Sequence, residues 1–200
     1  MLMLVLASEI TKKSEISVNK SKFIGLMLTS SSIKELKLKI EDLWKSEFSD
    51  ASHIVYAVRF KNRNEVIEPY FSDDGEPSGT AGKPLLTLLE GRSIINTAVI
   101  VIRYYGGINL GTGGLVKAYS EAAQMVIDQA NLIQHVEYNN YKILLKYNML
   151  DKFINLIYSI NGEVLERNFE EDILLKIRLP KGQEKNIKNF VDSNQLELND

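Results

Sequence analysis

Two glycine-rich loops hold most of the residues that could do chemistry. The first, residues 73–84, places three carboxylates, Asp73, Asp74 and Glu76, within four positions. Oxygen ligands of this kind suit Mg²⁺, and neighbouring glycines let a ligand approach the backbone. The alternative is a solvated acidic turn in which Thr80 caps the next helix, and these residues alone favour the turn. The other candidate binding residues of this loop are Gly75, Gly79, Thr80, Gly82 and Lys83.

The second loop, residues 103–117, lies between an apolar strand and the start of a helix. Free amide groups and the helix dipole at such a junction attract anions, and Arg103 and Lys117 add positive charge. The loop does not contain G-x-x-x-x-G-K-[ST], and Val116 stands where G-x-G-x-x-G needs its last glycine. A tight glycine-rich crossover is an equally good interpretation. The candidate binding residues are Arg103, Tyr104, Tyr105, Gly106, Gly107, Gly111, Thr112, Gly113, Gly114 and Lys117.

The remaining polar residues form no recognisable catalytic pattern. His53 shares a strand face with Arg59 and could line a ligand surface, although a packed or solvent-facing histidine is the more common case. A triad of His53, an aspartate and Ser78 can be imagined, but triads are defined by geometry, and Ser78 lies in no G-x-S-x-G turn. We therefore predict no catalytic residues, no metal site and no cofactor.

The elements that would position these loops follow from periodicity. Residues 52–60 alternate, with Ile54 and Val58 on one face and His53 and Val55 on the other. Residues 97–102 are apolar on both faces, which predicts a central strand covered on two sides. The other elements predicted before residue 134 are a strand at 22–29, a helix after Ser30–Ser32 with Ile33, Leu36, Ile40, Leu43 and Trp44 on its apolar face, a short helix at 83–90 and a helix at 115–130.

The rest of the chain has a different pattern, with a boundary predicted between residues 134 and 135. Strands and helices follow one another in the order β-α-β-β-α-β, which is typical of the ferredoxin-like split βαβ arrangement. The predicted elements are strands at 141–147, 162–169, 172–179 and 195–198 and helices at 149–159 and 181–191. This part contains no catalytic constellation, so we interpret it as structural or partner-binding.

Composition limits the class of protein. The chain has 200 residues, 44% hydrophobic and 25% charged residues, and no cysteine, which excludes a disulfide framework and a thiol nucleophile. A net charge of −2 provides no global attraction to nucleic acid, so RNA would need a local basic patch. The apolar start, MLMLVLA, has no basic segment before it and is far shorter than the ~20 residues of a membrane span. We expect a cytoplasmic protein.

The two loops closely resemble those of the YigZ/IMPACT family. The matching strings are SDDGEPSGTAGKP at residues 72–84 and VIVIRYYGGINLGTGGLVKAY at residues 99–119, supported by SKFI at 21–24 and by Ala51-x-His53. The resemblance extends through the C-terminal part and covers essentially the whole chain. Many relatives carry paired histidines where this chain has His53-Ile54, which weakens any role that needs two imidazoles there.

The resemblance implies an α+β protein: residues 1–134 similar to the second domain of ribosomal protein S5, and residues 135–200 a small ferredoxin-like domain. It also implies a link to translation, because eukaryotic IMPACT proteins are translational regulators and bacterial members are usually inferred to bind nucleic acid. We accordingly predict a non-enzymatic, translation-linked regulator that binds RNA or the ribosome through the two loops, with no membrane partner. A protein partner is a third class, and the sequence does not determine the oligomeric state.

The alternative is a phosphate- or nucleotide-binding enzyme similar to small-molecule kinases. In that interpretation the Gly106–Gly114 loop would hold a phosphate, with Mg²⁺ at Asp73, Asp74 or Glu76.

Overall fold

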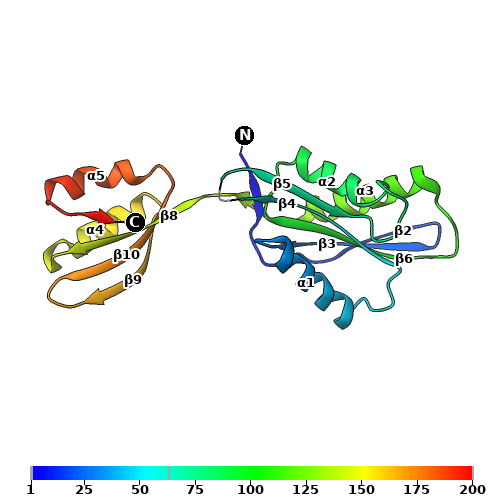
Figure 1. Cartoon of the computed structure of the whole chain (residues 1–200), viewed down its shortest axis with the longest axis horizontal. Coiled ribbons are helices and arrows are strands. Elements are labelled where there is room, and N and C mark those ends of the chain that lie inside the picture. Colours follow the sequence, from blue (N-terminus) through cyan, green and yellow to red (C-terminus); the bar gives the residue numbers. More distant parts are fainter. Residues whose placement is uncertain (1, 63, 200) are drawn as a thin grey trace. The chain divides into compact units, whose positions relative to one another are not determined.

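The chain folds into two units of mixed α/β structure. The computed structural model describes residues 2–62 and 64–199, and the chain divides into Met1–His135 and Val136–Asp200 (Figure 1). Among the helices of the described residues, none is long and apolar enough to cross a membrane.

The N-terminal unit is built on a five-stranded antiparallel sheet in the order β2-β3-β6-β4-β5. Helix α1 lies against one face of the sheet, and helices α2 and α3 lie against the other (Figure 1). A separate short ribbon joins β1 to β7 near the ends of this unit. The elements are β1 (Leu4–Leu6), β2 (Ser14–Val18), β3 (Ser21–Thr29), α1 (Ile33–Ser46), β4 (His53–Lys61), β5 (Ile67–Ser72), α2 (Gly82–Gly91), β6 (Thr97–Tyr104), α3 (Gly111–Gln129) and β7 (Leu132–Gln134).

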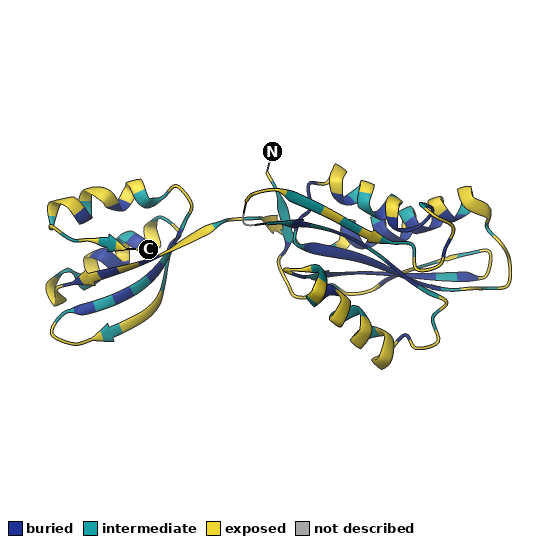
Figure 2. Ribbon diagram, in the orientation of Figure 1, coloured by how far each residue is buried: buried dark blue, intermediate teal, exposed yellow. Residues whose placement is uncertain are grey.

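Strand alternation sorts the side chains between two apolar layers. On β4, Val55 and Ala57 join the layer under α2 and α3, whereas Ile54 and Val58 join the layer under α1. Strand β6 lies between β3 and β4 and is buried from Thr97 through Arg103, as Figure 2 shows for the dark centre of the sheet. The prediction of a central strand covered on both faces is therefore confirmed.

Several local predictions differ from the structure: strands β1, β2 and β7 were not predicted, and the strand predicted at 195–198 is observed only as β11 (Leu198–Asn199). Helix α3 begins at Gly111 instead of 115, because the glycines of its first turn already have helical backbone hydrogen bonding. Trp44, predicted on the apolar face of α1, is 53% exposed and is not part of the apolar layer under α1; its indole N–H donates to the Ser49 carbonyl. Strand β5 was not predicted, since its sequence, IEPYFS, contains a proline and alternates only weakly. Proline is tolerated there because β5 is an edge strand.

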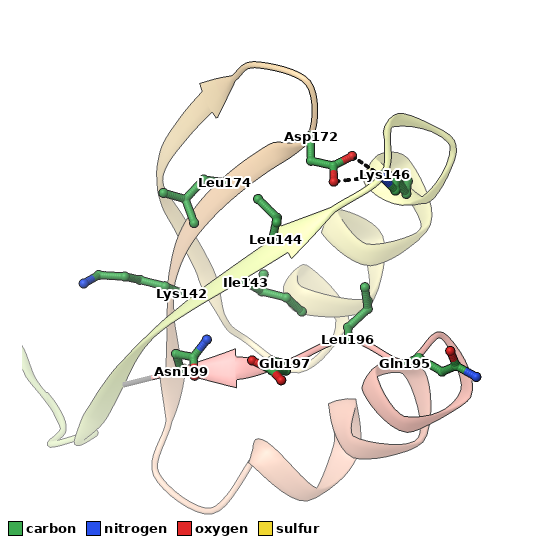
Figure 3. A pocket seen from close by; sticks show the side chains of 10 residues that line it. All are labelled: Lys142, Ile143, Leu144, Lys146, Asp172, Leu174, Gln195, Leu196, Glu197 and Asn199. Atoms are coloured by element: carbon green, nitrogen blue, oxygen red, sulfur yellow. Dashed lines mark hydrogen bonds and ion pairs between the residues drawn. The ribbon is translucent and has the colours of Figure 1, made fainter.

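The C-terminal unit is a four-stranded antiparallel sheet in the order β11-β8-β10-β9. Alternate residues of β8 and β10, such as Ile143 and Ile177, form an apolar core with α4 and α5. The opposite face is open, and a shallow hollow of about 370 Å³ on it is lined by Lys142, Leu144 and Leu174, beside the ion pair of Lys146 and Asp172 (Figure 3). The elements are β8 (Tyr138–Leu145), η1 (Tyr147–Met149), α4 (Leu150–Ser159), β9 (Glu163–Phe169), β10 (Ile173–Pro180), α5 (Glu184–Ser193) and β11 (Leu198–Asn199).

Helix α1 begins with a capping box that makes a pH-dependent contribution to stability. The Ser32 hydroxyl accepts from the Glu35 amide, while the Glu35 carboxylate accepts from the Ser31 amide and hydroxyl and pairs with Lys39 at 2.8 Å. Lys39 first, and then Ser31, lower the pKa of Glu35 from 4.5 to about 2. The folded-state pKa thus lies below the unfolded one. The stabilisation is present above pH 4.5 and is lost as the pH falls towards 2.

We predict that Glu35→Gln lowers the free energy of unfolding at neutral pH by about 1 kcal/mol, since the carboxylate is partly exposed and its shift must be discounted. The difference in the free energy of unfolding between the variant and the wild type should shrink as the pH falls from 4.5 to 2. Urea unfolding followed by the fluorescence of Trp44, the single tryptophan, measures the N-terminal unit alone. A stability difference that stays constant across this pH range would contradict the link between the Glu35 carboxylate and stability.

Candidate functional site

The site is built on a row of three side chains across neighbouring strands. Arg103 on β6 lies directly opposite Phe23 on β3 and His53 on β4. Helix α3 packs on β3 and β6, and the ring of its Tyr119 meets Phe23 edge-on at 5.2 Å. Strand register therefore brings a guanidinium and an imidazole together on one face of the sheet.

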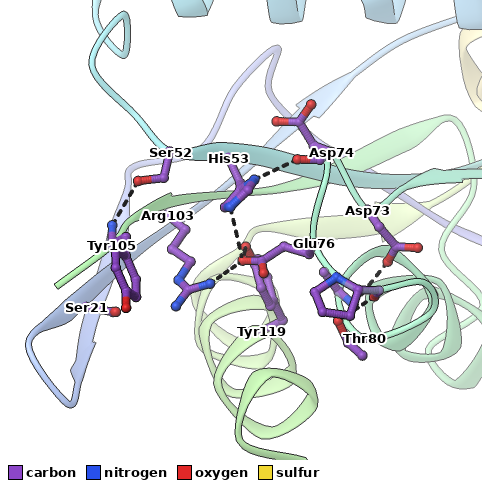
Figure 4. A network of polar contacts seen from close by, with 12 residues as sticks. Ser21, Ser52, His53, Asp73, Asp74, Glu76, Thr80, Arg103, Tyr105 and Tyr119 are labelled. Atoms are coloured by element: carbon purple, nitrogen blue, oxygen red, sulfur yellow. Dashed lines mark hydrogen bonds and ion pairs between the residues drawn. The ribbon is translucent and has the colours of Figure 1, made fainter. Parts of the chain in front are cut away.

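Glu76 from the first glycine-rich loop completes a buried polar network (Figure 4). Its Oε1 accepts hydrogen bonds from Arg103 Nη1 at 2.5 Å and from the Tyr119 hydroxyl at 2.7 Å. The side chains of Arg103 and Glu76 are only 6% and 4% exposed. Burial first, and then the adjacent carboxylate, raise the pKa of Tyr119 far above its ordinary value, so that its hydroxyl stays protonated and donates. The two opposite charges of this network compensate each other.

Aromatic rings fix the plane of the Arg103 guanidinium. Its central carbon lies 5.5 Å from the ring centre of Phe23 and 5.3 Å from that of Tyr105. A guanidinium held in this way makes favourable cation–π contacts and loses most of its freedom to swing. Tyr105 itself is 47% exposed, and its hydroxyl donates to Asn109. One side of the guanidinium is therefore covered by a ring that also faces solvent.

His53 is oriented by the backbone of the acidic loop. Its Nδ1 lies 2.6 Å from the carbonyl oxygen of Asp74, and because a carbonyl only accepts, Nδ1 carries a proton. Its Nε2 lies 3.8 Å from Glu76 Oε1, beyond hydrogen-bond distance. The imidazole thus turns Nε2 towards the buried network.

The carboxylates of the first loop separate into different roles. Asp73 accepts from the amides of Gly79, Ala81 and Gly82, while Asp74 accepts from the Ile54 amide at 2.6 Å. The expectation that Thr80 caps the following helix is wrong, because the Thr80 hydroxyl donates to the Pro77 carbonyl and Asp73 takes the helix amides instead. Among the described residues, no group of three His, Asp or Glu side chains is placed to hold a metal ion.

The second loop is held by close backbone packing. A Cβ at Gly106 would lie 2.1 Å from the carbonyl of Lys20. The Gly106 amide donates to the Ser21 hydroxyl. Tyr104 packs into the apolar layer under α1 and donates to Asp50, so it faces away from the network. Left-handed backbone occurs at Gly107 and Gly111, where only glycine is unstrained. Glycine is therefore required in this loop for backbone geometry.

The two loops meet at an open pocket of about 490 Å³. The N-cap residue of α3, Leu110, makes no side-chain cap, and no side chain of the described residues accepts a hydrogen bond from the amides of its first turn, Gly111–Gly114; Gly111 and Thr112 line the pocket. Of the predicted cations, Arg103 lines the pocket, whereas Lys83 and Lys117 are exposed on α2 and α3 and do not line it. The lining residues are His53, Glu76, Pro77, Arg103, Tyr105, Asn109, Leu110, Gly111, Thr112 and Leu115.

Two members of the network were not predicted as site residues. The alternation of β4 places His53 on the same face as Val55, but the pairing of β4 with β6 was needed to set it beside Arg103. Tyr119 lies on the buried side of α3 with Leu115 and Ala122, where it resembles an ordinary core residue. The one local signal for Tyr119 was a hydroxyl within an otherwise apolar face of the helix, because a buried tyrosine hydroxyl needs a hydrogen-bond partner.

These observations define a mixed α/β chain whose first unit holds a buried Glu–Arg–Tyr network under a glycine-rich helix start. Residues 19–127 match the Impact N-terminal domain. YigZ of Escherichia coli is 33% identical over 177 residues, 88% of this chain and 85% of that protein, and YvyE of Bacillus subtilis is 30% identical over 80% of this chain and 72% of its own. The chain therefore belongs to the IMPACT family.

A solved structure supports the fold over the whole length. The crystal structure of a hypothetical protein matches 99% of this chain and 96% of its own, with a TM-score of 0.69 and 29% sequence identity. The two-unit α/β architecture is thus shared with an experimentally determined structure.

We predict opposite effects from adding a methyl group to two glycines of the second loop. Gly106→Ala should lower the free energy of unfolding by about 1–3 kcal/mol, because the Cβ would overlap the Lys20 carbonyl. Gly113→Ala should leave stability unchanged or raise it by up to ~1 kcal/mol, because nothing lies within 4 Å and alanine favours helix. Urea unfolding monitored at Trp44 compares the two, and equal losses would contradict the prediction.

The network predicts a ranking of two further variants. Glu76→Gln should lower the free energy of unfolding by about 3 kcal/mol or more, because it leaves the buried Arg103 charge without its counter-ion. Tyr119→Phe should lower it by only about 1 kcal/mol, since Glu76 keeps its bond to Arg103. The same unfolding measurement applies, and a larger loss for Tyr119→Phe would show that the ion pair is not the dominant interaction.

Proposed function

We propose that this chain is a translation-linked regulator that binds single-stranded RNA, free or on the ribosome, at the pocket of its N-terminal unit. Membership of the IMPACT family supports the link to translation. The observation that carries the proposal is the uncapped first turn of α3 at the rim of a pocket that also exposes an aromatic ring, Tyr105.

The first turn of α3 is suited to a phosphate group. Its amides are capped by no side chain of the described residues, the positive end of the helix dipole lies there, and the glycines at 111, 113 and 114 leave the backbone accessible. Lys117, exposed on the next turn, adds a mobile positive charge. Glu76 does not oppose an anion at this rim as strongly as a free carboxylate would, because Arg103 neutralises it.

The exposed ring of Tyr105 supplies the second feature that RNA recognition uses. Unstacked bases bind proteins by stacking on aromatic rings, and such stacking contributes on the order of 1–3 kcal/mol per base. A phosphate at α3 and a base at Tyr105 would engage one nucleotide of a single strand. Double-stranded RNA offers no exposed base for this arrangement.

The remaining assignments belong to the same proposal. We infer a resemblance of the N-terminal unit to the second domain of ribosomal protein S5, and a ferredoxin-like C-terminal unit, for which the β11-β8-β10-β9 order is the supporting observation. We place the regulator in the cytoplasm, where ribosomes are. We assign the RNA contact to the N-terminal unit because that unit holds the pocket.

We predict that Lys117→Glu weakens binding of a short single-stranded RNA about tenfold at low salt and lowers the salt dependence by about one phosphate contact. The matched control is Lys34→Glu, which makes the same charge change at an exposed position on α1, on the other face of the sheet. Fluorescence anisotropy at several salt concentrations, and co-sedimentation with purified ribosomes, measure the effect.

Two results would contradict this function. Equal losses for the two variants would mean that binding reflects net charge alone. A wild-type chain that binds neither single-stranded RNA nor ribosomes at low salt would remove the proposal.

A further inference from the structure

Arg103 has one hydrogen-bonding edge in use and another free. Its Nη1 donates to Glu76, but Nε is buried and has no hydrogen-bond partner within the described part of the chain. Nη2 likewise forms no hydrogen bond or ion pair with any of the described residues. Nε and Nη2 form the side-on fork of the guanidinium, whose two N–H groups point the same way. A buried donor without a partner costs free energy, so this fork calls for a ligand that accepts twice.

Three common chemical groups accept from such a fork: a carboxylate, a phosphate and the O6/N7 edge of guanine. The first two are anions, and either would come close to the carboxylate of Glu76, which already neutralises Arg103. Guanine is neutral and avoids that repulsion. Its edge is also the group that arginine most often recognises in nucleic acids.

The surroundings of the fork suit a base. The pocket of about 490 Å³ falls in the size range of small-ligand sites, and Arg103 lines it together with Tyr105. Tyr105 lies beside Arg103 (Figure 4), with its ring centre 5.3 Å from the guanidinium carbon. The residue is 47% exposed, and its hydroxyl donates to Asn109. Because Nε is buried in this structure, entry of a ligand requires a local rearrangement at the pocket. Since Tyr105 is half exposed and its hydroxyl is held by one hydrogen bond, its ring can shift and stack on the entering base.

We propose that the pocket binds one guanine nucleotide of single-stranded RNA, with O6 and N7 of the base accepting hydrogen bonds from the fork of Arg103. The base stacks on Tyr105, and its phosphate lies at the first turn of α3. This inference rests on the proposed function for the source of the guanine. It adds base selectivity, which the phosphate contacts cannot provide.

The test compares oligouridine strands that carry one guanosine, one adenosine, one cytidine or one 7-deazaguanosine at the same position, together with GMP. Fluorescence anisotropy with the wild-type full chain should show the guanosine strand binding on the order of tenfold or more tightly than the others. The 7-deazaguanosine strand should lose this advantage, because a C–H group replaces the N7 acceptor. This comparison needs no protein variant.

Arg103→Lys tests the fork from the protein side. Lysine keeps a cation beside Glu76 but cannot donate two parallel hydrogen bonds. The variant should bind all strands with the affinity that wild type shows for adenosine, and Trp44 fluorescence checks that it is folded. Preserved guanosine selectivity in the folded variant would overturn the role of Arg103.

The outcomes separate this inference from the function on which it rests. Equal binding of all strands overturns guanine selectivity and leaves RNA binding in place. Binding of GMP without binding of any strand supports the guanine site but overturns RNA as its source. Absence of binding to the strands, to GMP and to purified ribosomes overturns both.

Discussion

The buried ion pair between Glu76 and Arg103 is the interaction on which the N-terminal unit depends most. It joins an acidic loop, the central strand β6 and, through Tyr119, helix α3. Removing two charges from water is costly, and the cost is met only when both partners are present in good geometry. The loop at 73–80 must therefore close onto the sheet for β6 to end with a buried arginine. The same closure aligns His53 through Asp74 and brings the two glycine-rich loops to one pocket.

Much of this arrangement was predictable from the sequence because strand periodicity records which face is buried. The alternation at 52–60 and the fully apolar run at 97–102 identified β4 and the central strand β6, both confirmed. The position of two glycine-rich loops next to strand ends also indicated where a site would form. The cap of α2 was not predictable in the same way. It comes from Asp73, eight residues before the amide of Ala81 that it accepts from, whereas local sequence favours the adjacent Thr80.

Which residues form the site depends on tertiary contacts that no local sequence pattern encodes. His53 meets Arg103 because β4 and β6 pair in one register, and a shift of one residue would send the imidazole to the face under α1. Tyr119 reaches Glu76 because α3 packs across β3. The roles of the three acidic residues in the first loop were equally ambiguous. In the sequence, a carboxylate that caps a helix cannot be told from one that holds a strand end or from one that pairs with an arginine. Only the fold distinguishes Asp73, Asp74 and Glu76.

The electrostatics of the pocket separate affinity from selectivity. The buried part of the pocket, formed by Glu76 and Arg103, is neutral overall because the two charges cancel. It therefore gives a phosphate no net attraction. Under the proposed function, the attraction for a phosphate would come from the first turn of α3 at the rim and from Lys117, which is exposed on the next turn without lining the pocket, and both contributions would weaken with salt. Under the proposed guanine site, the free N–H donors of Arg103, whose guanidinium contacts the rings of Phe23 and Tyr105, would discriminate between ligands by hydrogen-bond geometry and respond weakly to salt. A neutral base with two aligned hydrogen-bond acceptors is the kind of ligand that such a pair of buried donors would distinguish best.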